Sequence, residues 1–298
     1  MPALSAERRR EIERGFLVAL ARAFGGAIVF VLPVLMTMEM WQLGGSMEPG
    51  RLMLLLLAVL PLLVGLSHYI GFQETETWLD DVRDALVALL VGFVTSTVVL
   101  ALFGVIGPSQ SLDEMLGAIV IQAVPASFGA VIAQGQLGQG DEADRSRNRR
   151  AGYAGDLLFL AAGAVFLCFN IAPTEEVDLI AASMTPFHAL ALVALSIVSM
   201  HAIVYSVQFR GQAALRPEGL GFFSLFVCYT LAGYAVALLV CAGMLWDFGR
   251  LEGLGPGAAL RLVVVLGFPA SIGAAFHRAD LREHLEARVP AELAPVRR

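Results

Sequence analysis

The sequence has 298 residues, of which 57% are hydrophobic and only 15% are charged. This composition is far more apolar than a water-soluble domain can place in one core, so most of the chain is expected to lie in lipid. The net charge of −6 argues against a nucleic-acid partner.

Apolar runs long enough to cross about 30 Å of hydrocarbon predict eight transmembrane helices. The runs lie near residues 20–43, 52–72, 84–106, 115–134, 153–173, 185–209, 220–246 and 257–276. Backbone groups in lipid must form hydrogen bonds within their own segment, so each run is expected to be a helix. The predicted fold is therefore an all-α, polytopic membrane protein.

The arginines predict the orientation of these spans. With eight spans, both termini lie on one side of the membrane, together with the loops 73–83, 135–152 and 210–219. That side carries seventeen of the twenty basic residues. The other three are Arg51, Arg250 and Arg261. Cytoplasmic loops are enriched in basic residues, so we expect both termini to be cytoplasmic.

The strongest pattern in the chain is an internal repeat. The segment PASFGA at residues 125–130 matches PASIGA at residues 269–274 in all but one position. A second match lies near the start of each half, at one constant spacing. Its positions are Gly26, Ala27, Thr37 and Glu39 in the first half and Gly163, Ala164, Thr174 and Glu176 in the second. The alternative is that small residues and proline are simply common in spans.

The repeat predicts two parallel four-helix units, residues 16–134 and residues 153–278. A Gly-rich, charged cytoplasmic linker, residues 135–152, joins them. Residues 1–15 and 279–298 are then cytoplasmic tails. Because each unit has four spans, both copies start in the cytoplasm and are related by a rotation of about 180° around the membrane normal.

Pro125 and Pro269 lie within the fourth and the eighth predicted spans. We expect them to kink these helices, and the small residues that follow them let neighbouring backbones approach closely. A kinked pair on a pseudo-twofold axis fits a pore wall or a hinge. Structural packing alone is the alternative and the more common role.

Carboxylates lie at the outer ends of the first and fifth spans. Glu39 is in the first, Glu175 and Glu176 are in the fifth, and Asn170 lies about one turn further inside. Oxygen ligands from facing helices can replace the hydration shell of a cation, so these four residues are the candidate ion site. The alternative is that the acids are solvated and only favour the start of a short outer helix.

Other ionisable residues in the spans are further candidates. Arg261 lies near the outer end of the eighth span and is expected to form an ion pair with one of the outer glutamates. His68 and His201 lie in the inner halves of the second and sixth spans. They are candidates for a proton relay, although a histidine in a span more often bonds a neighbouring helix.

The remaining chemistry-bearing residues predict no catalytic, cofactor or zinc site. The three cysteines, Cys168, Cys228 and Cys241, lie in apolar runs without paired spacing, so we interpret them as packing residues without a disulfide framework. The chain has no zinc-protease, P-loop, nucleophile-elbow or dinucleotide motif. An enzyme is therefore the less favoured interpretation, and no cofactor is expected.

The stretches AFGGAIVFVLPVLMTMEMW, residues 23–41, and FNIAPTEEVDLIA, residues 169–181, carry a family resemblance. In them the chain resembles an uncharacterised family of bacterial multi-pass integral membrane proteins, a domain of unknown function. The resemblance implies a multi-pass protein of the bacterial inner membrane and gives no substrate.

Two classes of function follow from the sequence. The first is a channel or secondary transporter for protons or a small cation, because a pathway gains from duplicated spans with symmetric carboxylates. The second is a non-transporting protein, either a membrane scaffold or an enzyme that acts on lipid at the outer acidic residues. The expected partners are the lipid bilayer and small cations or protons, with an oligomer left open.

Overall fold

The computed structural model describes residues 6–70, 78–137, 153–211 and 226–286, and every regular element in these ranges is helical. Eight of the helices are long and apolar enough to cross a membrane. The prediction of eight spans in an all-α protein is therefore confirmed. The predicted linker lies outside the described residues from position 138 to 152, as do residues 1–5 and 287–298 of the predicted tails.

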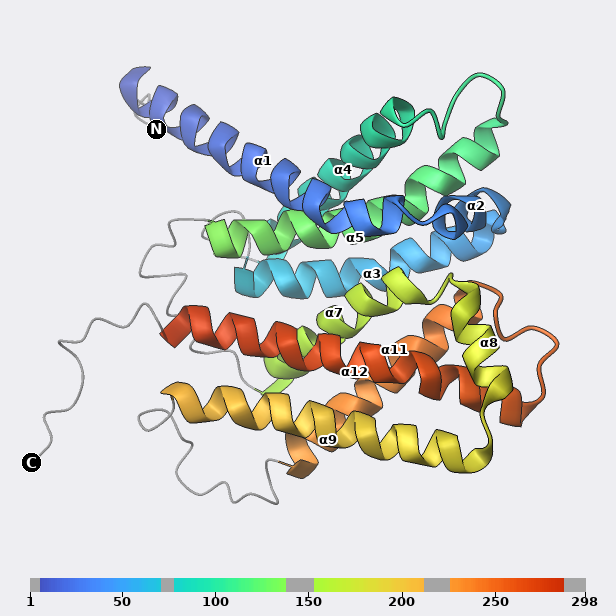
Figure 1. The fold of residues 1–298 in the computed structure, drawn as a ribbon. Helices are drawn as coiled ribbons and strands as arrows, with labels where there is room; N and C mark the ends of the chain where they lie inside the picture. Colours follow the sequence, from blue (N-terminus) through green and yellow to red (C-terminus); the bar gives the residue numbers. More distant parts are fainter. Residues whose placement is uncertain (1–5, 71–77, 138–152, 212–225, 287–298) are drawn as a thin grey trace, which may run out of the picture. The chain divides into compact units, whose positions relative to one another are not determined.

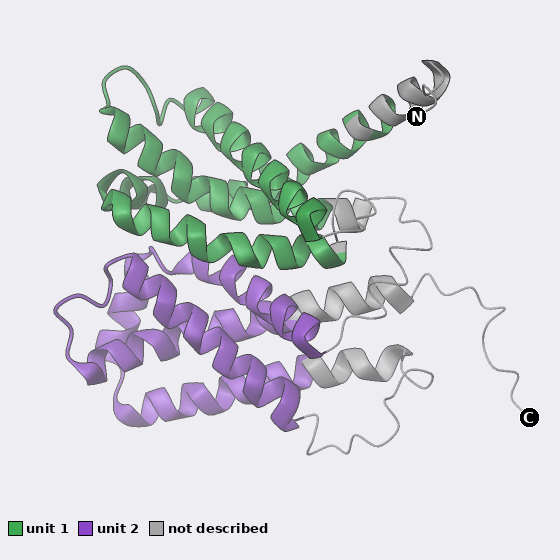
Figure 2. Ribbon diagram, turned by 180° about the vertical axis from the view of Figure 1, so that it is seen from behind, with its two compact units in different colours: residues 1–144 green, residues 145–298 purple. Residues whose placement is uncertain are grey.

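The chain divides into two compact units, residues 1–144 and residues 145–298 (Figure 2). Unit 1 contains four long helices and one short helix (Figure 1). They are α1 (Ala6–Leu35), α2 (Met38–Ser46), α3 (Pro49–Ile70), α4 (Trp78–Leu102) and α5 (Leu112–Leu137). The central helix is α5, which packs against all four others and is buried without interruption from Ile121 to Ala133.

Unit 2 has the same order of long and short helices. They are α7 (Tyr153–Ile171), α8 (Glu175–Ser183), α9 (Pro186–Gly211), the π-helical turn η1 (Phe226–Leu231) with α11 (Ala232–Asp247), and α12 (Pro256–Glu286). Here α12 packs against α7, α8, α9 and α11. Since α12 continues to Glu286, the predicted tail that begins at residue 279 starts as part of this helix.

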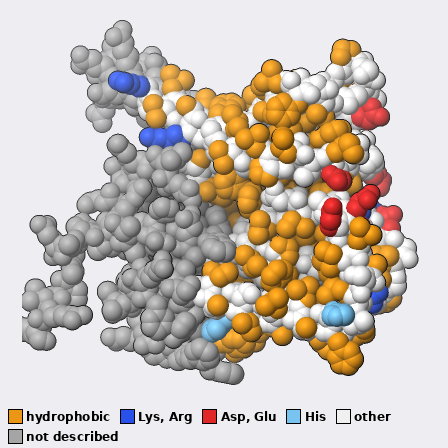
Figure 3. All heavy atoms as spheres, viewed as in Figure 1, with side chains coloured by type: hydrophobic (Ala, Val, Ile, Leu, Met, Phe, Trp, Pro, Cys, Tyr) orange, Lys and Arg blue, Asp and Glu red, His pale blue; other side chains and the backbone are white. Residues whose placement is uncertain are grey.

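The outward faces of the long helices are apolar, as contact with lipid requires. Figure 3 shows hydrophobic side chains over most of the described surface on its face. Large side chains that are more than three-fifths exposed include Leu90, Leu102, Leu190 and Leu239.

The first predicted span, residues 20–43, is wrong in its extent, because the helix ends at Leu35, before the predicted C-terminal end of the span. Helix α1 ends at Leu35 and α2 begins at Met38. Between them Thr37 has extended backbone, and its hydroxyl donates to Val34 O at 2.8 Å. Apolar side chains continue through this break, so hydropathy does not reveal it. In unit 2 the short separate helix that was the alternative at Glu175 and Glu176 is present as α8.

Several contacts occur at matching positions in the two units. Thr174 Oγ1 donates to Ile171 O before α8 as Thr37 does before α2, also at 2.8 Å. Ser127 and Ser271, the serines of the two PAS segments, each bond the carbonyl three residues earlier at 2.7 Å. Helices α4 and α11 both end before a glycine with positive φ, Gly104 at 70° and Gly249 at 73°. A positive φ at this position is the usual conformation that ends a helix.

Glycine allows the first and last helices of each unit to touch. A Cβ at Gly26 would overlap the carbonyl oxygen of Gly129 and the Cβ of Ala133. In unit 2 a Cβ at Gly273 would lie 2.5 Å from Gly163 O. Small residues at such crossings are how spanning helices approach closely in lipid, where no hydrophobic force drives them together.

We expect Gly26→Ala to destabilise the protein, because the new methyl group meets the backbone of the facing helix. Overpacking of this kind costs about 1–3 kcal/mol, which outweighs the gain of up to about 1 kcal/mol in helix propensity. Gly25→Ala is the matched control, since a Cβ at Gly25 has nothing within 4 Å. The measurement is the melting temperature of both variants in detergent. Equal shifts in the two variants would contradict the close crossing.

Candidate functional site

The outer glutamates lie in the first turns of the two short helices. Glu39 in α2 is half-buried, whereas Glu175 and Glu176 in α8 are exposed. Acids in the first turn of a helix are stabilised by the helix dipole. In unit 2 both glutamates are exposed. Their exposure fits solvated acids at a helix end better than it fits ligands of a buried ion site.

Asn170, which we predicted to lie beneath the acids, is half-buried and bonds its own helix. Its Nδ2 donates to Phe166 O at 2.7 Å. This carbonyl is one turn back along α7 and is not the one that Pro173 would free, which belongs to Phe169. The side-chain nitrogen is therefore used within α7.

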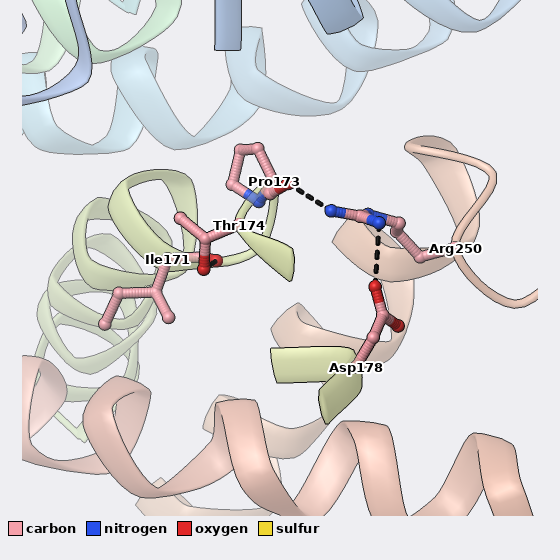
Figure 4. A network of polar contacts seen from close by, with 5 residues as sticks. All are labelled: Ile171, Pro173, Thr174, Asp178 and Arg250. Carbon is pink, nitrogen blue, oxygen red and sulfur yellow. Dashed lines mark hydrogen bonds and ion pairs between the residues drawn. The ribbon is translucent and has the colours of Figure 1, made fainter. Parts of the chain in front are cut away.

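An arginine that we had not singled out joins the loop after α11 to the start of α8 (Figure 4). Arg250 Nη1 donates to Asp178 Oδ2 at 2.7 Å, and Nη2 donates to Pro173 O. Gly249 directs the chain there, since its positive φ turns the backbone at the end of α11. Arg250 was counted in the sequence only as one of three basic residues on the outer side.

Arg261, which we predicted to pair with Glu39, Glu175 or Glu176, makes a different contact among the described residues of unit 2. Arg261 Nε donates to the backbone oxygen of Ala181 in α8 at 3.1 Å. Within unit 2 the ion pair at this end is made by Arg250 with Asp178 instead. The side chain of Arg261 thus links α12 to α8 by a hydrogen bond to the main chain of Ala181.

The two histidines proposed as relays each contact a neighbouring helix. His68 Nδ1 lies 2.8 Å from Asp81 Oδ2, between the end of α3 and the start of α4. The Asp81 side chain is 5% exposed, whereas that of His68 is 52% exposed. His201 Nδ1 lies 2.9 Å from Thr230 Oγ1 in η1. Only the His68 pair therefore joins a buried titratable group to an exposed one.

The interior of unit 1 holds buried polar side chains that the sequence did not reveal. Oxygen atoms of four of them have no hydrogen-bond partner among the described residues. They belong to Ser67 in α3, Thr95 and Ser96 in α4, and Gln122 in α5. The amide nitrogen of Gln122 reaches Val34 O in α1 at 3.5 Å. Short hydroxyl and amide residues within apolar runs are too common to stand out by pattern.

Pro125 and Pro269 lie inside helices that continue through them, from Leu112 to Leu137 and from Pro256 to Glu286. The serines two residues later bond the carbonyls just before the prolines. Among the side chains that the structure describes, no three His, Cys, Asp or Glu residues come close enough to hold a metal ion.

Comparison with known proteins places the chain in a family. No curated protein and no solved structure matches it. The family model described as "Putative integral membrane protein (DUF2391)" matches residues 19–280. This range includes the stretches at residues 23–41 and 169–181 that carried the resemblance, and it reaches from α1 into α12. Because the match covers most of the chain, this multi-pass membrane protein belongs to the DUF2391 family of integral membrane proteins.

Proposed function

We propose that the protein is a conduit, a channel or a secondary transporter, for protons or a small cation across the bacterial inner membrane. In the proposed orientation both termini are cytoplasmic. The observation that carries the proposal is a set of buried oxygen atoms in unit 1, on Ser67, Thr95, Ser96 and Gln122, that have no hydrogen-bond partner among the residues that the structure describes.

These oxygens are costly in a protein that only needs to be stable. A buried polar group without a partner costs about 1–3 kcal/mol, and lipid around a spanning bundle offers none. Hydroxyl and amide oxygens are also the groups that line water-filled or cation-conducting paths. The four side chains come from three helices that pack together, α3, α4 and α5. We propose that they line a polar path through unit 1, in which water or the conducted ion would supply the missing hydrogen-bond partners.

The His68–Asp81 pair supplies a proton-exchange group at the cytoplasmic end of the proposed path. Asp81 is buried, while His68 is half exposed, and histidine is a common proton shuttle in proteins. A proton can therefore pass between solvent and the buried carboxylate through one side chain. Ser67, the residue before His68, continues the polar groups into the bundle.

At the opposite end of each unit, the outer carboxylates of that unit are proposed as an entrance. Glu39 in unit 1 and Glu175 and Glu176 in unit 2 concentrate negative charge near the helix ends, which raises the local concentration of cations. Exposed acids suit an entrance, where the ion is still hydrated, better than a tight site. Asn170 is proposed to line the entrance of unit 2.

We propose in addition that the two units are copies of one four-span repeat, covering residues 16–134 and 153–278. The shared order of helices supports this, as do the matching threonine, serine and glycine contacts. The parallel arrangement follows from the even number of spans in each copy. In this scheme the helices that carry Pro125 and Pro269 are the central helix of each unit and the candidates for movement.

The test is ion flux into liposomes that contain the purified protein, measured for several cations and with a pH gradient. Ser96→Ala combined with Gln122→Leu should lower the flux severalfold, because it removes two of the polar groups of the proposed path. Leu is the residue that unit 2 has at the matching position, Leu266, so the change is expected to be tolerated by the fold.

Thr97→Ala is the matched control for this experiment. Thr97 neighbours Ser96 but is exposed and bonds Phe93 O within its own helix, so its loss should leave the flux unchanged. Wild-type protein that passes no ion faster than empty liposomes would contradict the proposed function. A double variant that conducts like the wild type would contradict the proposed path.

A further inference from the structure

Two cysteines that are far apart in the chain meet inside unit 2. The sulfur of Cys168 in α7 lies 3.1 Å from the sulfur of Cys241 in α11. Both thiols are free, and both residues are 0% exposed. The sequence analysis interpreted these residues as packing residues without a disulfide framework. It did not predict this contact, because the contact depends on how α7 and α11 face each other.

We propose that Cys168 and Cys241 form a reversible disulfide that links α7 to α11 when a lipid-soluble quinone oxidises them. Two S–H bonds break and one S–S bond forms, while two protons and two electrons reduce the quinone to the hydroquinone. A disulfide bond is about 2.0 Å long, so the sulfurs need to approach by only about 1 Å.

The surroundings of the pair select the oxidant. Both residues are fully buried in helices of spanning length, so the surrounding lipid keeps a charged, water-soluble disulfide away from them. A quinone dissolves in the bilayer and accepts two electrons with two protons, which matches the balance of the reaction. Thiol oxidation depends on access as well as on reactivity, so this class of oxidant is the one that the location favours.

The same end of unit 2 already holds α7 and α11 in one arrangement. The rings of Phe169 and Phe248 meet edge to face at 5.7 Å, and Arg250 bonds Pro173 O. These residues follow Cys168 and Cys241 along their two segments. The pair is therefore preorganised, and oxidation would lock the end of unit 2 that carries α8 and its outer acids.

The experiment uses the full-length protein in liposomes, treated with a fully substituted benzoquinone, with molecular iodine, or with a reductant. The protein is then denatured and alkylated with a maleimide, and mass spectrometry counts the labelled thiols. Of the three cysteines, all three should be labelled after reduction and only Cys228 after either oxidant. The disulfide-linked peptides should contain Cys168 and Cys241.

Three variants complete the test. Cys228→Ala should go from two labelled thiols to none on oxidation. Cys168→Ser and Cys241→Ser should each keep two labelled thiols under every condition. Three labelled thiols in the wild type after both oxidants, or a link that includes Cys228, would overturn the proposed pair. A disulfide with iodine but none with the benzoquinone would overturn the quinone as the oxidant.

Discussion

Glu39→Gln and Glu176→Gln are each expected to lower cation flux at least about tenfold, which corresponds to about 1.4 kcal/mol. Glutamine keeps the size and hydrogen bonding of the side chain but removes the charge that attracts a cation. The two residues occupy the same position in α2 and α8. Each is the second residue after the N-cap threonine, Thr37 or Thr174, and lies in the first turn of its helix. The single variants should therefore behave alike, and the double variant should be more severe than either.

Glu48→Gln is the matched control for these variants. Glu48 is an exposed acid just after α2, at the same end of unit 1, and it has no acidic counterpart in unit 2. Its loss should leave the flux near the wild-type value. Wild-type flux in the Glu39 and Glu176 double variant, with an unchanged melting temperature, would show that these acids are only solvated helix ends.

The sequence was sufficient to predict the spans because a spanning helix needs little more than length and apolar composition. It failed at the end of α1, where hydropathy runs on through Met36 and Thr37 although the helix has ended. The sequence match between the two halves held the missing information. Thr37 matches Thr174, which follows Pro173, and a proline followed by threonine is a recognisable helix break. Assuming the same helix break at Thr37 in unit 1 would have predicted that a separate helix, α2, begins just after it.

The polar contacts were harder to predict, because depth in the membrane does not determine which residue faces which. Arg250 and Arg261 were both predicted to lie at the outer end, yet among the described residues Arg250 pairs with an acid, Asp178, whereas Arg261 bonds the main chain of Ala181. Which arginine pairs with an acid depends on the conformation of the turn after α11, which carries Arg250, and on the rotation of α12, which carries Arg261. Cys168 and Cys241 illustrate the same limit, since their contact follows from two helix rotations that apolar sequence leaves undetermined.

The proposed repeat leads to a prediction about unit 1, which contains no cysteines. Cys168 corresponds to Val31 by the spacing that relates Gly163 to Gly26. Cys241 corresponds to Ser96 by the spacing that relates Gly249 to Gly104, the glycines with positive φ that follow α11 and α4. Val31 and Ser96 are both 0% exposed, and their helices α1 and α4 pack together. If the units are copies of one repeat, the side chains of Val31 and Ser96 are expected to lie in contact.

Val31→Cys combined with Ser96→Cys should form a disulfide in a variant whose three native cysteines are replaced by alanine. Iodine treatment in liposomes, followed by denaturation and alkylation, should reduce the labelled thiols from two to none. Val29→Cys with Ser96→Cys is the control, because Val29 is 63% exposed on another face of α1 and should keep both thiols labelled. If the units are copies of one fold, α1 and α4 face each other through the residues equivalent to those between α7 and α11. The pair at positions 31 and 96 should then cross-link as we propose for Cys168 and Cys241. If both double variants keep two labelled thiols while the protein melts at the temperature of its cysteine-free parent, α1 and α4 do not repeat the geometry of α7 and α11, and the duplication is wrong.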